Sequence, residues 1–220
     1  MDVLSLLLPG RCAGCGRPGA PVCDACLVSL VRLAPPVCER CGAPGAWPVK
    51  RCAECAGRRL AFRSARGAIA YEGVARSIVS GWKESGRRDI AASLSRVVAE
   101  VIPRPAVDVL TFVPGDRERS LARGHVPAAG LALALGRLWA VDVLPLLSRR
   151  ASARRQASLP LDERRSNVRG VFASRGPAPA RVCLVDDVYT TGSTASACAT
   201  ELRRAGARRV DVVCLSRAVR

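Results

Sequence analysis

Four Cys-x-x-Cys pairs between residues 12 and 55 constrain the fold more than any other feature of the sequence. The short gap lets a tight turn direct both thiolates of a pair at one metal ion, and two pairs complete a closed tetrahedral site. Disulfides are the alternative for so many cysteines, but the start of the chain lacks the pattern of a secretory signal. We therefore expect eight zinc ligands, which are Cys12, Cys15, Cys23, Cys26, Cys38, Cys41, Cys52 and Cys55.

These cysteines are expected to hold two structural zinc ions. Few large apolar side chains lie between residues 12 and 55, so burial alone cannot offset the chain entropy of this segment. Zinc binding contributes about 10–16 kcal/mol in such domains, and a closed four-thiolate site has no open position for catalysis. We favour sequential grouping, the first four cysteines around one ion and the last four around the other, although the spacing equally allows an interleaved arrangement. Such a domain serves as a scaffold or contacts nucleic acid or protein.

The composition changes after the last Cys pair. No cysteine occurs between residues 56 and 182, and β-like runs alternate with helical patterns, which is typical of a parallel α/β sheet flanked by helices. We predict a small Cys-rich zinc-binding domain over residues 1–58 and a larger α/β domain over residues 59–220. The expected strands are 66–71, 107–113, 182–186 and 210–216, and the expected helices are 74–83, 89–101, 120–138 and 193–205.

The segment that begins at residue 182 has the pattern of a phosphate-binding loop. A continuous apolar run indicates a buried central strand, which ends in Asp186 and Asp187 before a hydroxyl-rich loop and a helical sequence. Backbone N–H groups at a helix N-terminus favour an anion. The carboxylates would repel a bare phosphate, so they indicate a ligand that also carries hydroxyls or a metal ion, and a ribose 5-phosphate meets both demands. The loop residues are Thr190, Thr191, Gly192, Ser193 and Thr194.

Residues 182–194 resemble the signature of type I phosphoribosyltransferases. The Cys pairs and several further segments resemble the ComF family, which joins an N-terminal double zinc ribbon to a phosphoribosyltransferase domain. The further segments are 71–73, 81–83, 113–124, Gln156, 165–167 and 170–172. The resemblance covers nearly the whole chain. It implies a type I phosphoribosyltransferase-like parallel sheet, binding of phosphoribosyl pyrophosphate with Mg²⁺, an association with DNA uptake in competence, and protein partners that process DNA.

The resemblance also implies roles for individual residues. Asp186 and Asp187, the catalytic candidates, would accept hydrogen bonds from the ribose 2- and 3-hydroxyls and stabilise positive charge at the breaking C1 bond. Residues 190–194 would bind the 5-phosphate. The remaining candidates for binding phosphoribosyl pyrophosphate are Arg117, Arg119, Arg123 and Lys83. Weaker candidates in the basic segment 149–181 are Gln156, Arg165 and Asn167. We interpret this segment as a mobile lid or a nucleic-acid contact rather than as part of the core.

One loop departs from the family pattern. Residues 114–116 and 124–127 lack the family's Pro-Leu-His-like start and its Gly-Phe-Asn-Gln-like end, so the amides that would contact substrate are missing. His125, the only histidine, receives no catalytic role because a lone loop histidine is more often polar surface. Cys183, Cys198 and Cys214 lie in apolar contexts and are expected to be buried. Leu131, Ala132, Leu135, Leu138 and Trp139 are expected to form the core face of a helix.

The charge of the chain keeps a second function open. Thirty-five Lys and Arg stand against 18 Asp and Glu, giving a formal net charge of +17, and only Lys50 and Lys83 are lysines. This charge suits nucleic acid, an acidic membrane or phosphorylated small molecules, although a GC-rich genome also favours Arg over Lys. The first hypothesis is an enzyme that transfers phosphoribosyl to an unidentified nitrogen acceptor. The alternative is a competence factor that binds single-stranded DNA and uses the phosphoribosyl site non-catalytically.

No segment predicts a membrane span. The apolar runs 3–8 and 126–136 both fall short of the about 18 residues that a spanning helix needs. We therefore expect a cytoplasmic protein. A redox or metal-storage function is disfavoured, because it leaves the acidic pair and the loop after it without a role.

Overall fold

The computed structural model describes residues 10–84, 87, 89–116, 120, 124–150 and 170–219. At its centre lies a four-stranded sheet with the order β1-β6-β5-β2, in which every neighbouring pair is parallel. The strands are β1 (Ser64–Ala70), β2 (Val109–Phe112), β5 (Arg181–Tyr189) and β6 (Arg209–Arg217). The prediction of a parallel α/β sheet with 182–186 as an interior strand is confirmed.

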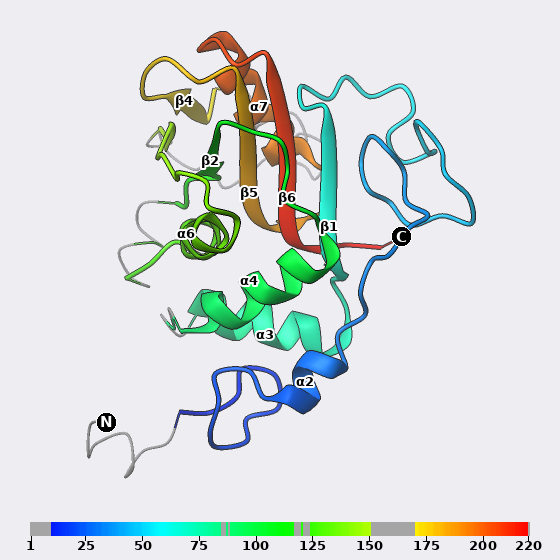
Figure 1. Cartoon of the computed structure of the whole chain (residues 1–220), viewed down its shortest axis with the longest axis vertical. Helices are drawn as coiled ribbons and strands as arrows, with labels where there is room; N and C mark the ends of the chain where they lie inside the picture. The colour runs from blue at the N-terminus through cyan, green and yellow to red at the C-terminus, as the bar shows by residue number, and fades with distance from the viewer. Residues whose placement is uncertain are drawn as a thin grey trace, which may run out of the picture.

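Helices cover both faces of this sheet (Figure 1). The helices α3 (Gly73–Glu84), α4 (Ile90–Val101) and α6 (Pro127–Trp139) lie on one face, and α7 (Ser193–Arg204) lies on the other. In β5, Cys183 and Val185 face the first group, whereas Val182 and Leu184 face α7, as the two-residue period of a strand requires. The strand is thus buried on both sides, which explains its continuous apolar sequence.

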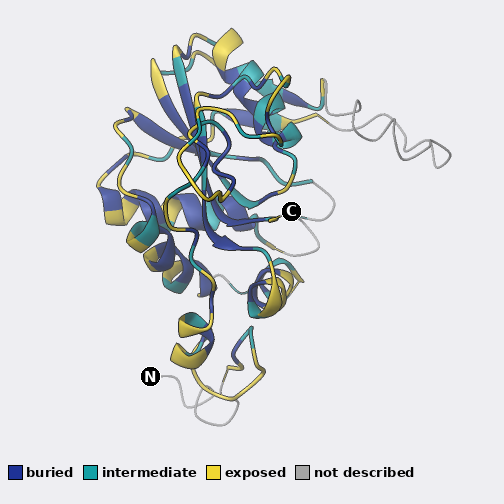
Figure 2. Ribbon diagram, turned by 90° about the vertical axis from the view of Figure 1, so that its right-hand side faces the viewer, coloured by how far each residue is buried: buried dark blue, intermediate teal, exposed yellow. Residues whose placement is uncertain are grey.

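Figure 2 shows buried residues along the strands and exposed residues on the outer sides of the helices. Cys183, Cys198 and Cys214 are fully buried, as predicted. Among the helices in the described part of the chain, none combines enough length with enough apolar character to span a bilayer.

The predicted helix 120–138 begins later than expected. The helix that ends at Trp139 starts at Pro127, because Gly124 has a φ of +68° and Val126 is extended. Proline suits a first helical turn, where its missing N–H is not needed. Leu131, Ala132, Leu135 and Trp139 are buried as expected, but Leu138 is 50% exposed, so its assignment to the core was wrong.

The basic segment 149–181 is not a loop throughout. A second, two-stranded sheet pairs β3 (Leu147–Arg149) with β4 (Phe172–Ser174) in antiparallel register, and Phe172 is buried. The interpretation of this segment as lying outside the core is therefore wrong at its C-terminal end. Strands of three residues are too short to give a periodic signal in the sequence.

The two halves of the Cys-rich segment contribute to different cores. Cys12, Cys26 and neighbouring apolar residues join the core of α3 and α4, whereas Cys38, Cys55 and Phe62 join the core of α7. In Figure 1 the dark blue half, with the short helix α2 (Asp24–Val28), lies below α3, and the lighter blue half runs beside β1. The domain boundary after residue 58 stays a prediction.

Candidate functional site

The eight cysteines gather in two groups of four, in the sequential order that we favoured. A tetrahedron with arms of about 2.3 Å has edges of about 3.8 Å. The sulfur–sulfur distances are 3.7 Å for Cys15–Cys23 and for Cys38–Cys55, and 3.5 Å for Cys41–Cys52. The first zinc cluster is Cys12, Cys15, Cys23 and Cys26, and the second zinc cluster is Cys38, Cys41, Cys52 and Cys55; both fit structural zinc.

Backbone N–H groups favour the ionised form of one thiol in each cluster. The N–H groups of Gly14 and Cys23 lie 3.4 Å and 3.3 Å from Cys12 Sγ and donate to it. Burial opposes ionisation of Cys12, but these hydrogen bonds outweigh it and lower the pKa of its thiol to about 6. The same balance, burial against several backbone N–H groups, lowers the pKa of Cys38 to about 6. Burial raises the pKa of three other cluster thiols, which are Cys26, Cys41 and Cys55. The backbone donors therefore favour the thiolate, the form that binds zinc, at one ligand of each cluster.

The acidic pair lies near the carboxyl end of β5. Asp186 accepts a hydrogen bond from the backbone N–H of Asp187 at 2.9 Å. Burial and the charge of Asp187 raise the pKa of Asp186 to about 8, against the effect of that hydrogen bond and of Lys83. The Nζ of Lys83, near the end of α3, lies 3.1 Å from Oδ2 of Asp187. Lys83, predicted to contact phosphate, forms an ion pair with Asp187 in this structure.

The loop after β5 turns directly into α7. Gly192 has a φ of +74°, and a Cβ on this residue would overlap the hydroxyl of Tyr189, so only glycine fits. The hydroxyl oxygens of Thr191 and Ser193 are hydrogen bonded at 2.9 Å. Because the first N–H groups of a helix have no partner within the helix, the start of α7 offers donors to an anion. The acids, the hydroxyls and these donors lie on one continuous strand–loop–helix segment, and their role in binding a ligand stays a prediction.

Comparison with known proteins places the chain in a family. A double zinc ribbon domain matches residues 3–57. The chain is 30% identical over 228 residues to the DNA utilization protein YhgH of Salmonella typhi, covering 96% of this chain and 99% of that protein. The protein belongs to the ComF family. The YhgH protein of Salmonella typhimurium strain LT2 is 29% identical over 228 residues, with the same coverage of 96% and 99%.

Solved structures overlap with part of this ComF-family chain. Glutamine phosphoribosylpyrophosphate amidotransferase from B. subtilis is 22% identical, with 59% of this chain and 26% of that chain covered and a TM-score of 0.40. Adenine phosphoribosyltransferase from Thermoanaerobacter pseudethanolicus is 13% identical, with 69% and 90% covered and a TM-score of 0.39. TM-scores this low do not by themselves establish a common fold. The fold class follows instead from the parallel strand order, the zinc clusters and membership of the ComF family.

The structure adds contacts that sequence reasoning missed in this ComF-family protein. Arg58, just after the second zinc cluster, donates from Nη1 to the backbone oxygen of Thr191 at 2.6 Å. The backbone N–H of Ala61 donates to Oγ of Ser196 in α7 at 3.1 Å. No local pattern links residues so far apart in the chain. The zinc-binding segment therefore contacts the candidate phosphate loop directly.

Several predicted residues have no described position. Arg117, Arg119 and Arg123, and also Gln156, Arg165 and Asn167, lie outside the described residues. His125 lies near the start of α6, with its Nε2 2.9 Å from the backbone oxygen of Trp82. No role in catalysis is assigned to it.

Proposed function

We propose that this protein binds phosphoribosyl pyrophosphate together with Mg²⁺ and transfers the phosphoribosyl group to a nitrogen acceptor. The observation that carries the proposal is the continuous arrangement of Asp186, Asp187 and the loop 190–194 between β5 and α7. Membership of the ComF family supports it. The 5-phosphate would accept hydrogen bonds from the loop's N–H groups and hydroxyls.

The acidic pair would act on the ribose. Its carboxylates would accept hydrogen bonds from the 2- and 3-hydroxyls and stabilise the positive charge that develops at C1. In the proposed step, the bond between C1 and the pyrophosphate oxygen breaks with its electron pair leaving on pyrophosphate. The lone pair of the acceptor nitrogen forms the new bond to C1, and the nitrogen's proton passes to solvent.

Carboxylate oxygens are preferred ligands of Mg²⁺, so Asp186 and Asp187 fit this ion. When bound, Mg²⁺ would neutralise part of the charge of the pyrophosphate leaving group. Lys83, which neutralises Asp187 at 3.1 Å, would be free to contact pyrophosphate once the carboxylate engages ribose or the ion. A cation near the pair would also favour the ionised form of Asp186, whose pKa is raised in the unliganded protein.

Calorimetric titration tests this proposal. Zinc-loaded protein is titrated with phosphoribosyl pyrophosphate with and without Mg²⁺, alongside the double variant Asp186→Asn/Asp187→Asn. We expect Mg²⁺-dependent binding that the double variant loses, while Asp142→Asn, an exposed aspartate, binds as the wild type does. Absence of binding by the folded wild type would contradict the proposal.

A second candidate function, binding of single-stranded nucleic acid, is supported by a basic groove beside the second zinc cluster. The groove has a volume of about 710 Å³ and is lined by Glu39, Arg40, Lys50, Arg51, Arg63, Ser64 and Arg66. Within the described residues, only Arg63 of its five cations pairs with a carboxylate, Asp211 at 4.0 Å.

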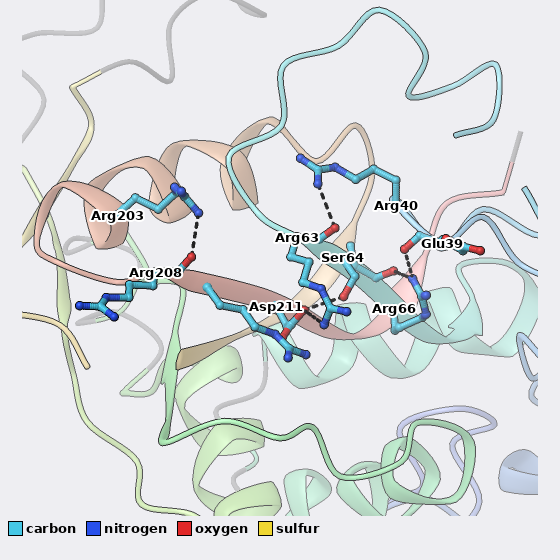
Figure 3. A network of polar contacts seen from close by, with 10 residues as sticks. Glu39, Arg40, Arg63, Ser64, Arg66, Arg203, Arg208 and Asp211 are labelled. Atoms are coloured by element: carbon cyan, nitrogen blue, oxygen red, sulfur yellow. Dashed lines mark hydrogen bonds and ion pairs between the residues drawn. The ribbon is translucent and has the colours of Figure 1, made fainter. Parts of the chain in front are cut away.

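Backbone hydrogen bonds orient the guanidinium groups of this groove. As Figure 3 shows, Arg66 reaches toward the main chain of Glu39 and Arg40 toward that of Arg63; the distances are 2.9 Å and 3.1 Å to the backbone oxygens. These contacts fix the cations without neutralising them. Trp47, three residues before Lys50, is 69% exposed and could stack on a base.

Fluorescence anisotropy with a labelled oligothymidine tests this candidate. Lys50→Glu/Arg51→Glu should weaken binding and reduce the salt slope, because each lost phosphate contact removes about 0.7 from the slope on single strands. Arg96→Glu/Arg137→Glu is the control, since it changes the charge equally at exposed positions on α4 and α6, which do not line the groove. Equal weakening by both variants would indicate non-specific attraction only.

A further inference from the structure

A buried arginine ties together the two Cys pairs of the second zinc cluster. Arg217, the last residue of β6, is 1% exposed. Its Nη1 donates to the backbone oxygen of Cys41 at 2.7 Å, and its Nη2 forms an ion pair with Oε2 of Glu54 at 2.6 Å. Glu54 lies between Cys52 and Cys55. The guanidinium thus contacts both halves of the cluster.

The same guanidinium packs against the residue that supports the phosphate loop. The Cζ of Arg217 lies 4.8 Å from the ring centroid of Tyr189, a buried residue at the end of β5. The hydroxyl of Tyr189 fills the space that a Cβ on Gly192 would occupy. Phe62 packs against the same ring in a T-shaped arrangement, with the centroids 6.3 Å apart. The ring is therefore held between the cluster and the glycine of the loop.

A second connection involves the main chain of the loop. Arg58, three residues after the ligand Cys55, donates to the backbone oxygen of Thr191 at 2.6 Å. In a trans peptide the carbonyl and the following N–H point in opposite directions. Holding the Thr191 oxygen toward Arg58 therefore directs the N–H of Gly192 to the other side, where it is available to an anion.

The first zinc cluster has a different neighbourhood. A Cβ on Gly14 would lie 2.7 Å from Cys26 Sγ and 2.9 Å from Val74 of α3, so this cluster packs closely on that helix. Within the described residues, no hydrogen bond or ion pair joins the first cluster to the loop 190–194. The two clusters can therefore be compared directly. The second cluster contacts the loop through Arg217, Tyr189 and Arg58, and the first cluster has no such contacts among the described residues.

We propose that Arg217, Tyr189 and Arg58 are positioning residues that couple metal binding at the second zinc cluster to the phosphate-binding conformation of the loop 190–194. The inference rests on the proposed function, in which this loop binds a 5-phosphate. Because coupling between two sites is reciprocal, a sugar phosphate bound at the loop must strengthen retention of the ion in the second cluster. The first cluster should not respond.

The test measures zinc release to a chromogenic chelator, with and without ribose 5-phosphate. Cys15→Ser and Cys52→Ser, each with one intact cluster, assign the released zinc to a cluster. In wild type, ribose 5-phosphate should raise the chelator concentration that removes half of the zinc from the second cluster by about fivefold or more, a typical size for coupling between sites, and leave the first unchanged. Arg58→Met, at a partly exposed position, should reduce this effect without loss of folding.

Arg217→Lys separates positioning from simple stability. A lysine keeps the charge opposite Glu54, but its single ammonium group cannot also contact the Cys41 carbonyl and cover the Tyr189 ring. We expect the variant to bind two zinc ions and to lose the effect of ribose 5-phosphate on zinc release. Retention of the full effect in both Arg217→Lys and Arg58→Met would overturn the proposal.

The remaining outcomes are distinct. If ribose 5-phosphate binds wild type without strengthening zinc retention, or strengthens it equally in both clusters, the coupling is overturned and the proposed function stands. Failure of zinc-loaded wild type to bind ribose 5-phosphate or phosphoribosyl pyrophosphate in calorimetry overturns the proposed function and the coupling together.

Discussion

The two zinc clusters have the same ligands and the same Cys-x-x-Cys pairs, but they lie in different surroundings. In the first, Cys15 is exposed and the cluster packs on α2 and α3. In the second, Cys38, Cys41 and Cys55 are 1–2% exposed and the cluster adjoins the α7 side of the sheet. Identical ligand chemistry therefore supports different parts of the molecule, and the packing partners decide which.

The clusters approach the candidate site from two directions. A Cβ on Gly81 of α3 would lie 3.6 Å from Ala13, so the first cluster supports the helix whose end carries Lys83. The second supports Tyr189 and Thr191 through Arg217 and Arg58. The comparison shows that the first cluster packs against the helix that carries Lys83, whereas the second contacts residues next to and within the loop 190–194.

Removing one ligand from each cluster gives the largest expected difference. Cys41→Ser should cost more than about 4 kcal/mol of unfolding free energy, the range for loss of a buried metal site. Cys15→Ser should cost less, because Cys15 is exposed and water can replace its sulfur. Urea unfolding and the zinc content per chain measure both. Equal losses would contradict the distinction between the clusters.

Breaking the ion pair of Arg217 tests the link at the second cluster. Glu54→Gln should cost about 3 kcal/mol, the lower end for a buried pair, because Glu54 itself is 30% exposed whereas Arg217 is 1% exposed. The control is Glu100→Gln, which removes a pair with Arg32 whose side chains are 61% and 28% exposed, and it should cost about 0–1 kcal/mol. Thermal unfolding of both variants gives the difference between their losses of stability. If Glu54→Gln loses no more stability than the control, the ion pair of Arg217 contributes little.

Two glycines with a positive φ, Gly192 in the loop and Gly57 after the second cluster, separate backbone strain from a side-chain clash. Gly192→Ala should cost about 2 kcal/mol and weaken ribose 5-phosphate binding, because it combines a positive φ with an overlap with Tyr189. Gly57 has a similar φ of +72° but no atom within 4 Å of an added Cβ. Gly57→Ala should therefore cost about 1 kcal/mol and leave binding unchanged. If calorimetry finds that Gly192→Ala and Gly57→Ala weaken ribose 5-phosphate binding equally, the loss of binding does not arise in the loop 190–194.

The last prediction concerns pH. Because the pKa of Asp186 rises from 3.8 to about 8 on folding, the native state holds a proton that the unfolded state releases between these values. Its contribution to stability is therefore present at low pH and lost as pH rises toward about 8. We measure the unfolding free energy of wild type and Asp186→Asn from pH 5 to pH 9. The stability of the wild type relative to the variant should fall as pH rises and then level off. A shift in favour of the wild type would contradict the raised pKa.

Local sequence predicted the parts of the site that lie close together in the chain. Each Cys pair, the apolar strand ending in Asp186 and Asp187, and the loop with Gly192 are contiguous segments, and their spacing alone sets a turn, a pleat or a helix start. Short strands were missed, since Phe172 belongs to a three-residue strand without periodicity. Leu138 was misplaced because its helix exposes that side to solvent.

The sequence by itself determined the zinc ligands, the parallel α/β class and the strand–loop–helix that carries the acids. Only the tertiary structure decided that Lys83 pairs with Asp187, that Arg58 contacts Thr191, and that the second cluster rather than the first adjoins the loop 190–194. The physical reason is that local spacing fixes the geometry of neighbouring residues, whereas contacts such as that between Arg217 and Cys41 depend on which strands become adjacent when the sheet assembles.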